Sequence, residues 1–179
     1  MVVVAAVVWQ AIAQRRTRRL RGEFGPEYAR TVSSADSRRE AESELAARKK
    51  RRQELDIHAL SDDQRAWYTE QWQAVKAQFV DDPGGSVIRA DSLIQSAMAD
   101  RGYPVEDFDQ RATDLSVDHP RVVENYREGD RLFRKVSGGE GTTEDLRQAM
   151  RAYRRLFDEL VEPDKADEAV REHDHILSR

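Results

Sequence analysis

The sequence contains no cysteine, and this absence removes several kinds of chemistry at once. Without a thiol there is no disulfide, no cysteine nucleophile and no cysteine ligand for a metal. Lysine is also scarce, because 25 of the 30 basic residues are arginine. The net charge of −4 gives no overall attraction to nucleic acid, so positive charge matters only where the sequence concentrates it.

The short motifs of nucleotide-binding, zinc-protease and serine-hydrolase sites are absent as well. The glycines at 84–85 and 138–141 have no flanking strand pattern, which a phosphate-binding loop requires. Of the four histidines, His173 and His175 would point about 200° apart on a helix, and His119 lies in an Asp-His-Pro string typical of a helix start. His58 stands alone. We therefore predict no enzyme activity, no cofactor and no metal site.

Long apolar runs are almost absent too, and the longest lies at the N-terminus. Residues 2–13 are apolar except for Gln10, and a basic segment follows at once. A secretory signal peptide carries its positive charge before the apolar run, so this order instead predicts a single-pass anchor in the cell membrane, with the rest of the chain cytoplasmic. The predicted anchor residues are Val2, Val3, Val4, Val7, Val8, Trp9 and Ile12, and the juxtamembrane basic residues are Arg15, Arg16, Arg18, Arg19 and Arg21.

The apolar run is short for this role, because crossing a bilayer takes about 20 apolar residues. We favour the interpretation that Met1 is an internal codon of a longer transmembrane helix. A second interpretation is an interfacial helix whose arginines lie on anionic headgroups. A third is an N-terminal helix buried in the folded core.

No segment shows the period-two alternation of a strand, so the predicted fold class is all-α. We expect a helical bundle of about five helices, preceded by a polar helix and the N-terminal membrane-anchoring helix. The predicted divisions are residues 1–21 (apolar segment and basic stop), 22–60 (connector and charged helix), 61–162 (bundle) and 163–179 (tail).

The polar helix is expected to begin at Ser37, which together with Glu40 has capping-box form, and to end near Leu55. Its apolar edge is thin, so we expect an exposed stalk. The preceding residues 23–28 are expected to form a connector, because Gly25-Pro26 breaks the chain. The basic run at 48–52 suits a solvated face or a patch on anionic lipid better than a phosphate-backbone contact, because no aromatic residue interleaves with it.

The bundle helices are expected to begin at Ser61, Asp82, Pro104, Asp118 and Thr142, where capping residues or first-turn prolines occur. Pro104 should open a helix whose first turn holds an acidic cluster. Apolar residues then recur at helical spacing. The expected core is Tyr68, Trp72, Val75, Phe79, Val87, Ala90, Ile94, Ala97, Met98, Val105, Phe108, Ala112, Leu115, Val122, Tyr126, Phe133, Leu146, Ala149, Met150, Tyr153, Leu156, Phe157 and Leu160.

Six strings support a comparison with a known family: FGPEY at 24–28, FVDDP at 79–83, RGYP at 101–104, SVDHP at 116–120, ENYR at 124–127 and TEDLRQAM at 143–150. From Arg21 to about Leu160 the chain resembles an uncharacterised bacterial family, mainly actinobacterial, of small membrane-anchored or "secreted" hypothetical proteins. The resemblance implies a longer apolar N-terminal span and brings no catalytic residues.

Our leading hypothesis is a membrane-tethered helical protein-interaction module of unknown specific role. Its partners would be membrane lipid at the N-terminus and an unidentified protein bound by the bundle. The first alternative is a soluble nucleic-acid-associated protein that uses the two basic segments. The second, which we rank last, is an enzyme or small-ligand protein with a pocket near His119 and Tyr126.

Overall fold

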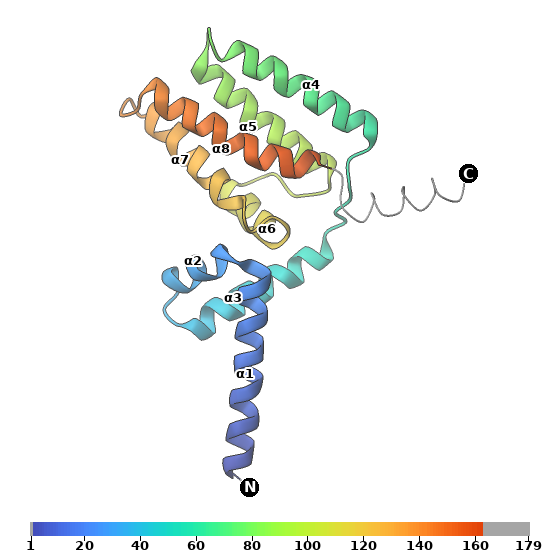
Figure 1. Ribbon diagram of the computed structural model, residues 1–179, viewed down its shortest axis with the longest axis vertical. Helices are drawn as coiled ribbons and strands as arrows, with labels where there is room; N and C mark the ends of the chain where they lie inside the picture. The colour runs from blue at the N-terminus through green and yellow to red at the C-terminus, as the bar shows by residue number, and fades with distance from the viewer. Residues whose placement is uncertain (1, 163–179) are drawn as a thin grey trace, which may run out of the picture. The chain divides into compact units, whose positions relative to one another are not determined.

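All regular secondary structure in the residues that the structure describes is helical. The structure is a computed structural model that describes the backbone of residues 2–162 and the side chains of residues 10, 11 and 13–162. That part contains no strand, which confirms the all-α prediction. The eight helices labelled in Figure 1 are α1 (Val2–Phe24), α2 (Pro26–Ser34), α3 (Arg38–Glu54), α4 (Asp62–Gln78), α5 (Pro83–Asp100), α6 (Phe108–Asp118), α7 (Val123–Ser137) and α8 (Thr143–Val161).

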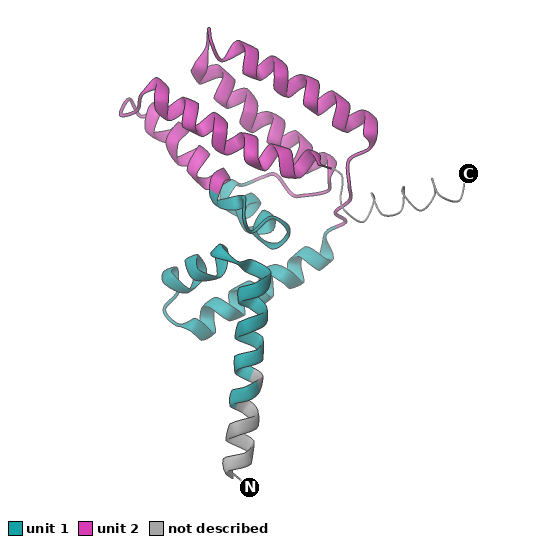
Figure 2. Cartoon of the chain, in the orientation of Figure 1, with its two compact units in different colours: residues 1–55, 107–124 teal, residues 56–106, 125–179 magenta. Residues whose placement is uncertain are grey.

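These helices belong to two compact units, which Figure 2 colours separately. Unit 1 comprises residues up to Leu55 together with Asp107–Glu124, so α6 joins α1, α2 and α3. The described part of unit 2 is residues 56–106 and 125–162. The sequence instead placed α6 in a continuous bundle at 61–162. The difference arises because α3 is attached to α6 largely by polar contacts, which an apolar pattern does not reveal.

The core of unit 1 is small and is shared by three helices. Leu20 and Phe24 of α1 pack with Tyr28 of α2 and Leu45 of α3. The expected connector at 23–28 is wrong, because α2 is a helix that begins within it. The chain turns at Gly25, whose φ of +48° favours glycine, and the next residue is a proline at the first helical position.

The polar helix α3 begins where the sequence placed it, since the Ser37 side chain accepts a hydrogen bond from the Glu40 amide. It is not an exposed stalk, however. Ala41, Glu42 and Leu45 are buried against the rest of unit 1. One narrow stripe of buried residues is enough to attach the helix because charged side chains on either side also find partners.

In unit 2, α5 packs against both α4 and α8 (Figure 1). The capping boxes at Ser61 and Thr142 and the cap at Asp82 are all present, as the sequence predicted. Most of the expected core on these three helices is buried. The rings of Trp72 and Phe157 stack with centroids 4.5 Å apart.

Two helix starts differ from the prediction. Pro104 does not open α6; the side chain of Asp107 caps it instead by accepting from the Gln110 amide at 2.9 Å. His119 does not start α7 but ends α6, because its amide donates to the Leu115 carbonyl at 2.7 Å. The sequence showed good capping residues in both places, and only the backbone contacts determine which of them is used.

Candidate functional site

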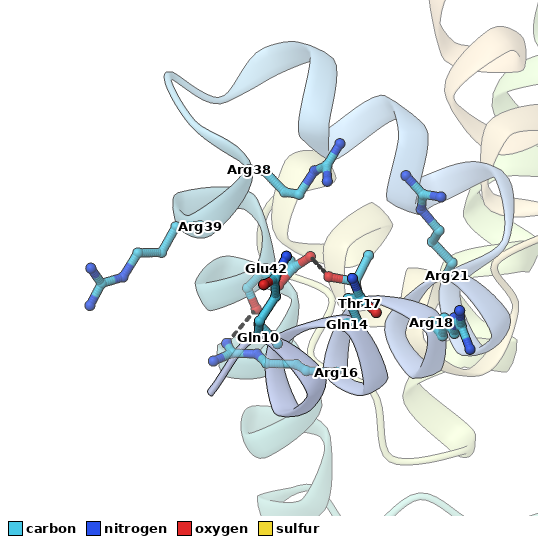
Figure 3. Close-up of a pocket in the computed structure, with 10 residues that line it drawn as sticks. Gln10, Gln14, Arg16, Thr17, Arg18, Arg21, Arg38, Arg39 and Glu42 are labelled. Carbon is cyan, nitrogen blue, oxygen red and sulfur yellow. Dashed lines mark hydrogen bonds between the residues drawn. The ribbon is translucent and has the colours of Figure 1, made fainter. Parts of the chain in front are cut away.

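An open groove of about 680 Å³ lies on unit 1, between α1 and the first turns of α3 (Figure 3). In the view of Figure 3, Arg38 lies between Glu42 and Arg21, whereas Arg39 extends away from them. We call this concavity the arginine groove. Its lining residues are Gln10, Ala13, Gln14, Arg16, Thr17, Arg18, Arg21, Arg38, Arg39 and Glu42.

Glu42 fixes the two walls of the groove relative to each other. Its side chain is buried, and Oε1 accepts hydrogen bonds from the Thr17 hydroxyl at 2.6 Å and from the Tyr28 hydroxyl at 2.9 Å. Its backbone carbonyl accepts from Nη2 of Arg16 at 3.1 Å. The carboxylate is therefore used inside the protein to join α1, α2 and α3, and it holds the arginines of α1 opposite those of α3.

Arg21 is positioned by an aromatic ring. Its guanidinium carbon lies 5.2 Å from the centroid of the Tyr28 ring, within the range of a cation–π contact. The negative face of the Tyr28 ring attracts the guanidinium, and Arg21 remains exposed. Tyr28 thus makes two contacts in the site: its hydroxyl donates a hydrogen bond to Glu42, and its ring makes the cation–π contact with Arg21.

The groove concentrates positive charge that no carboxylate neutralises. It holds five arginines and one glutamate, a formal net charge of +4. Among the described residues none of these five arginines forms an ion pair with a carboxylate. Since each guanidinium presents several N–H donors in a planar fork, the groove has the chemistry to bind an oxyanion such as phosphate.

The second basic run, at residues 48–52, differs from the arginine groove because carboxylates neutralise most of its charge. Four of its five residues are neutralised within unit 1, and only Lys50 has no such partner among the described residues. The pairs are Arg48 with Glu27 (2.8 Å) and with Glu44, Lys49 with Glu23 (2.8 Å), Arg51 with Asp114 (2.9 Å), and Arg52 with Asp118. Lys50 and Arg51 are exposed, which agrees with the expected solvated face, and contact with lipid stays a prediction. The four paired residues also hold unit 1 together.

The burial of Glu27 and Arg48 shows that their ion pair belongs to the interior of unit 1. The carboxylate of Glu27 is fully buried, the Arg48 side chain is 10% exposed, and Nη1 of Arg48 also donates to the Ser116 hydroxyl at 3.2 Å. Nearer the surface, the Lys49 ammonium holds the pKa of the Glu23 carboxyl below its ordinary value of 4.5. The run therefore connects α3 to α1, α2 and α6.

The predicted site residues divide into two groups. The side chains of the anchor residues, Val2, Val3, Val4, Val7, Val8, Trp9 and Ile12, lie outside the described residues, as do His173 and His175. Of the juxtamembrane arginines, Arg16, Arg18 and Arg21 line the groove, whereas Arg15 and Arg19 do not. Sequence reasoning missed Arg38 and Arg39. Their position next to the Ser37 cap was visible, but only the fold of α2 brings them to α1.

A second concavity, of about 400 Å³, lies on unit 2 between α4 and α8. Its apolar part is formed by Trp72, Phe79 and Met150, and Gln73, Lys76, Arg147, Arg151 and Arg154 complete the lining. We call it the α4–α8 groove. No acidic residue is among these lining residues, although Glu144 and Asp158 pair with three of the arginines from outside the groove. The surface combines an apolar floor with a basic rim.

Metal chemistry finds no support in the described residues, where no three histidine, aspartate or glutamate side chains are grouped to hold an ion. The same residues include no helix with the length and apolar character that crossing a membrane requires. No family model, curated protein or solved structure matches this chain. The family resemblance drawn from the six sequence strings therefore stays a prediction.

Proposed function

We propose that this protein is a membrane-tethered helical interaction module, with the apolar start of α1 as its tether. One observation carries the proposal. The helix α1 runs without a break from Val2 to Phe24, and its end is fixed in unit 1, where Leu20 and Phe24 are buried. The apolar run and the folded unit therefore share one helix, and attaching the run to lipid would hold unit 1 directly at the surface.

The charge distribution supports a cytoplasmic orientation. Arg15, Arg16, Arg18, Arg19 and Arg21 follow the apolar run at once, and arginines that flank a membrane segment are retained on the cytoplasmic side. The described side chains of this segment agree with an interfacial position. All five arginines are exposed on α1, so none is used to build the core.

Membrane fractionation of the full chain tests the tether. We expect the protein to sediment with membranes, to resist a high-salt wash and to need detergent for release. Replacing Val4 and Val8 with aspartate should move it to the soluble fraction, because charged residues oppose insertion into hydrocarbon. The matched variant, with Arg15 and Lys50 changed to glutamine, should stay membrane-bound. Recovery of the unmodified chain in the soluble fraction would refute the tether, and release by salt would indicate an electrostatic, interfacial attachment instead.

For the protein partner, we propose the α4–α8 groove as the binding surface and an amphipathic helix with acidic flanks as its occupant. The apolar floor of Trp72, Phe79 and Met150 suits the apolar face of a helix. On the rim, Lys76 has no carboxylate partner among the described residues, and it suits an acidic side chain beside that helix. Trp72 is rigidly held by its stacking on Phe157, which lowers the cost of ordering it on binding.

Site-specific photo-crosslinking in cells tests this surface. A crosslinker at Gln73, inside the groove, should capture an acidic amphipathic segment that mass spectrometry can map, and the corresponding synthetic peptide should compete. Met150→Asp should abolish the capture, because it places a like charge in the apolar floor. A crosslinker at Gln148, on α8 but outside the groove, is the control. Equal capture of the same segment from both positions would contradict the assignment.

A further inference from the structure

We infer that the arginine groove binds the phosphate group of an anionic lipid, and that it prefers a phosphomonoester headgroup to a phosphodiester. This inference rests on the proposed tether and assigns a ligand to the residues beside it. It starts from a contrast between the two basic segments. Unit 1 neutralises most of the run at 48–52 internally, whereas no described residue forms an ion pair with the arginines of the groove.

The position of the groove along α1 suits a headgroup. The groove begins at Gln10 and Ala13, where the apolar run ends. At about 1.5 Å per residue, Arg16 to Arg21 follow Ala13 by about 5 to 12 Å along the helix axis. The headgroup layer of one leaflet is on the order of 5–8 Å thick. With the apolar run in the hydrocarbon, the groove therefore opens at the depth of the lipid phosphates.

The charge and donors of the groove favour a phosphomonoester. Such a group carries about −1.5 to −2 near neutral pH and has three strongly accepting oxygens, whereas a phosphodiester carries a single charge. A surface of net charge +4 with donors on both walls gains more from the former. The second wall matters here, because Arg38 of α3 lies across the groove from the arginines of α1 and lets a phosphate be held from two sides, whereas Arg39 adds positive charge at the edge of the groove.

Nucleic acid offers the same phosphate chemistry but fits the surroundings less well. Among the described side chains, no aromatic residue lines the groove on which a base would stack, and the groove ends at the apolar run rather than extending along the surface. The second basic segment, which a nucleic-acid backbone would also need, is largely paired within unit 1.

Vesicle flotation with the full chain tests the inference. The probes are phosphatidylcholine vesicles containing either phosphatidic acid, a phosphomonoester, or phosphatidylglycerol, a phosphodiester, matched for total negative charge. We expect tighter binding to the phosphatidic acid vesicles. Arg38→Gln with Arg39→Gln should reduce this preference about 25-fold, because each arginine near the surface contributes on the order of fivefold. The matched control is Lys50→Gln with Arg121→Gln, which removes two exposed charges of unit 1 outside the groove.

The possible results separate the inference from the proposed function. Binding to every vesicle, neutral ones included, with no headgroup preference would leave the tether standing and overturn the inference. Equal loss in the two double variants would also overturn it, because general charge attraction would then suffice. Binding to no vesicle would refute the tether together with the inference. Glycerol phosphate bound in solution, or a DNA duplex bound in a salt-dependent way, without any vesicle preference, would assign the groove to a free phosphate or to nucleic acid instead.

Discussion

At the scale of single residues, the feature that most determines unit 1 is the buried carboxylate of Glu27. It lies 2.8 Å from Nη1 of Arg48 and 3.8 Å from Nη1 of Arg30, and water does not reach it. A carboxylate in this position is tolerated only with a charged partner at hydrogen-bonding distance, since burial of an unpaired charge is costly. Arg48 therefore contributes to stability by preventing the Glu27 carboxylate from being a buried, unpaired charge.

We expect Arg48→Met to destabilise unit 1 by about 3 kcal/mol, because it removes the nearest charged partner of a buried carboxylate while keeping most of the apolar stem. Urea denaturation followed by circular dichroism measures the change. Lys50→Met is the control on the same helix, since Lys50 is exposed, and its effect should stay within about 0.5 kcal/mol. Equal effects of the two substitutions would show that the Glu27 pair does not support the fold.

At the scale of elements, α8 shows how a sequence motif becomes a stable helix start. Asp145 accepts hydrogen bonds from the Thr142 amide at 2.7 Å and the Thr142 hydroxyl at 2.8 Å, and from the Lys135 ammonium at 3.1 Å. The bonds to Thr142, with that to Lys135, hold the pKa of the Asp145 carboxyl below its ordinary 3.8. The charged carboxylate is therefore the form that caps α8.

This shift has a defined consequence for stability against pH. Because the folded pKa lies below the unfolded value, the cap stabilises the protein fully above pH 3.8 and loses its contribution as pH falls through the folded pKa. We expect Asp145→Asn to lower the stability of the protein at neutral pH, because the amide keeps an acceptor oxygen for Thr142 but loses the negative charge that Lys135 contacts. The cost should shrink toward zero in acid, where the native side chain is itself neutral.

Chemical denaturation of both proteins at neutral pH and in acid measures this change. Glu140→Gln, at an exposed neighbouring position, should show little effect at either pH. A cost for Asp145→Asn that stays constant with pH would mean that the capping geometry, and not the charge, is what α8 requires.

At the scale of the whole molecule, the chain passes between the two units more than once. Residues up to Leu55 belong to unit 1 and residues 56–106 to unit 2, then 107–124 belong again to unit 1, and the rest of the described chain belongs to unit 2. Each unit has its own buried core, so each is expected to open as a cooperative group of its own.

Amide hydrogen exchange measures whether the two units open separately. Arg48→Met should raise exchange mainly in α2, α3 and α6, and Leu156→Ala, at a buried position of unit 2, mainly in α4, α5 and α8. Uniform acceleration in both variants would contradict two separate cooperative groups.

How much of this was predictable depends on the kind of interaction involved. The helices α4, α5 and α8 could be placed from sequence, because caps and apolar spacing are local signals and both are strong there. The helix α2 was missed because Gly25-Pro26 reads equally well as a break in the chain or as a turn between two helices. The starts of α6 and α7 were misplaced because several capping residues competed within a few positions.

The sequence by itself determined the all-helical class, the caps of α3, α4, α5 and α8, and the order of an apolar run followed by arginines, since all of these depend on residues close together in the chain. Only the tertiary structure decided what the charges do. It paired Arg48, Lys49, Arg51 and Arg52 with carboxylates from α1, α2, α3 and α6. It also placed Arg38 and Arg39 on α3 across the groove from α1, where no described residue forms an ion pair with either of them. Charge pairing is decided by distance in space, and a linear pattern of arginines does not contain that distance.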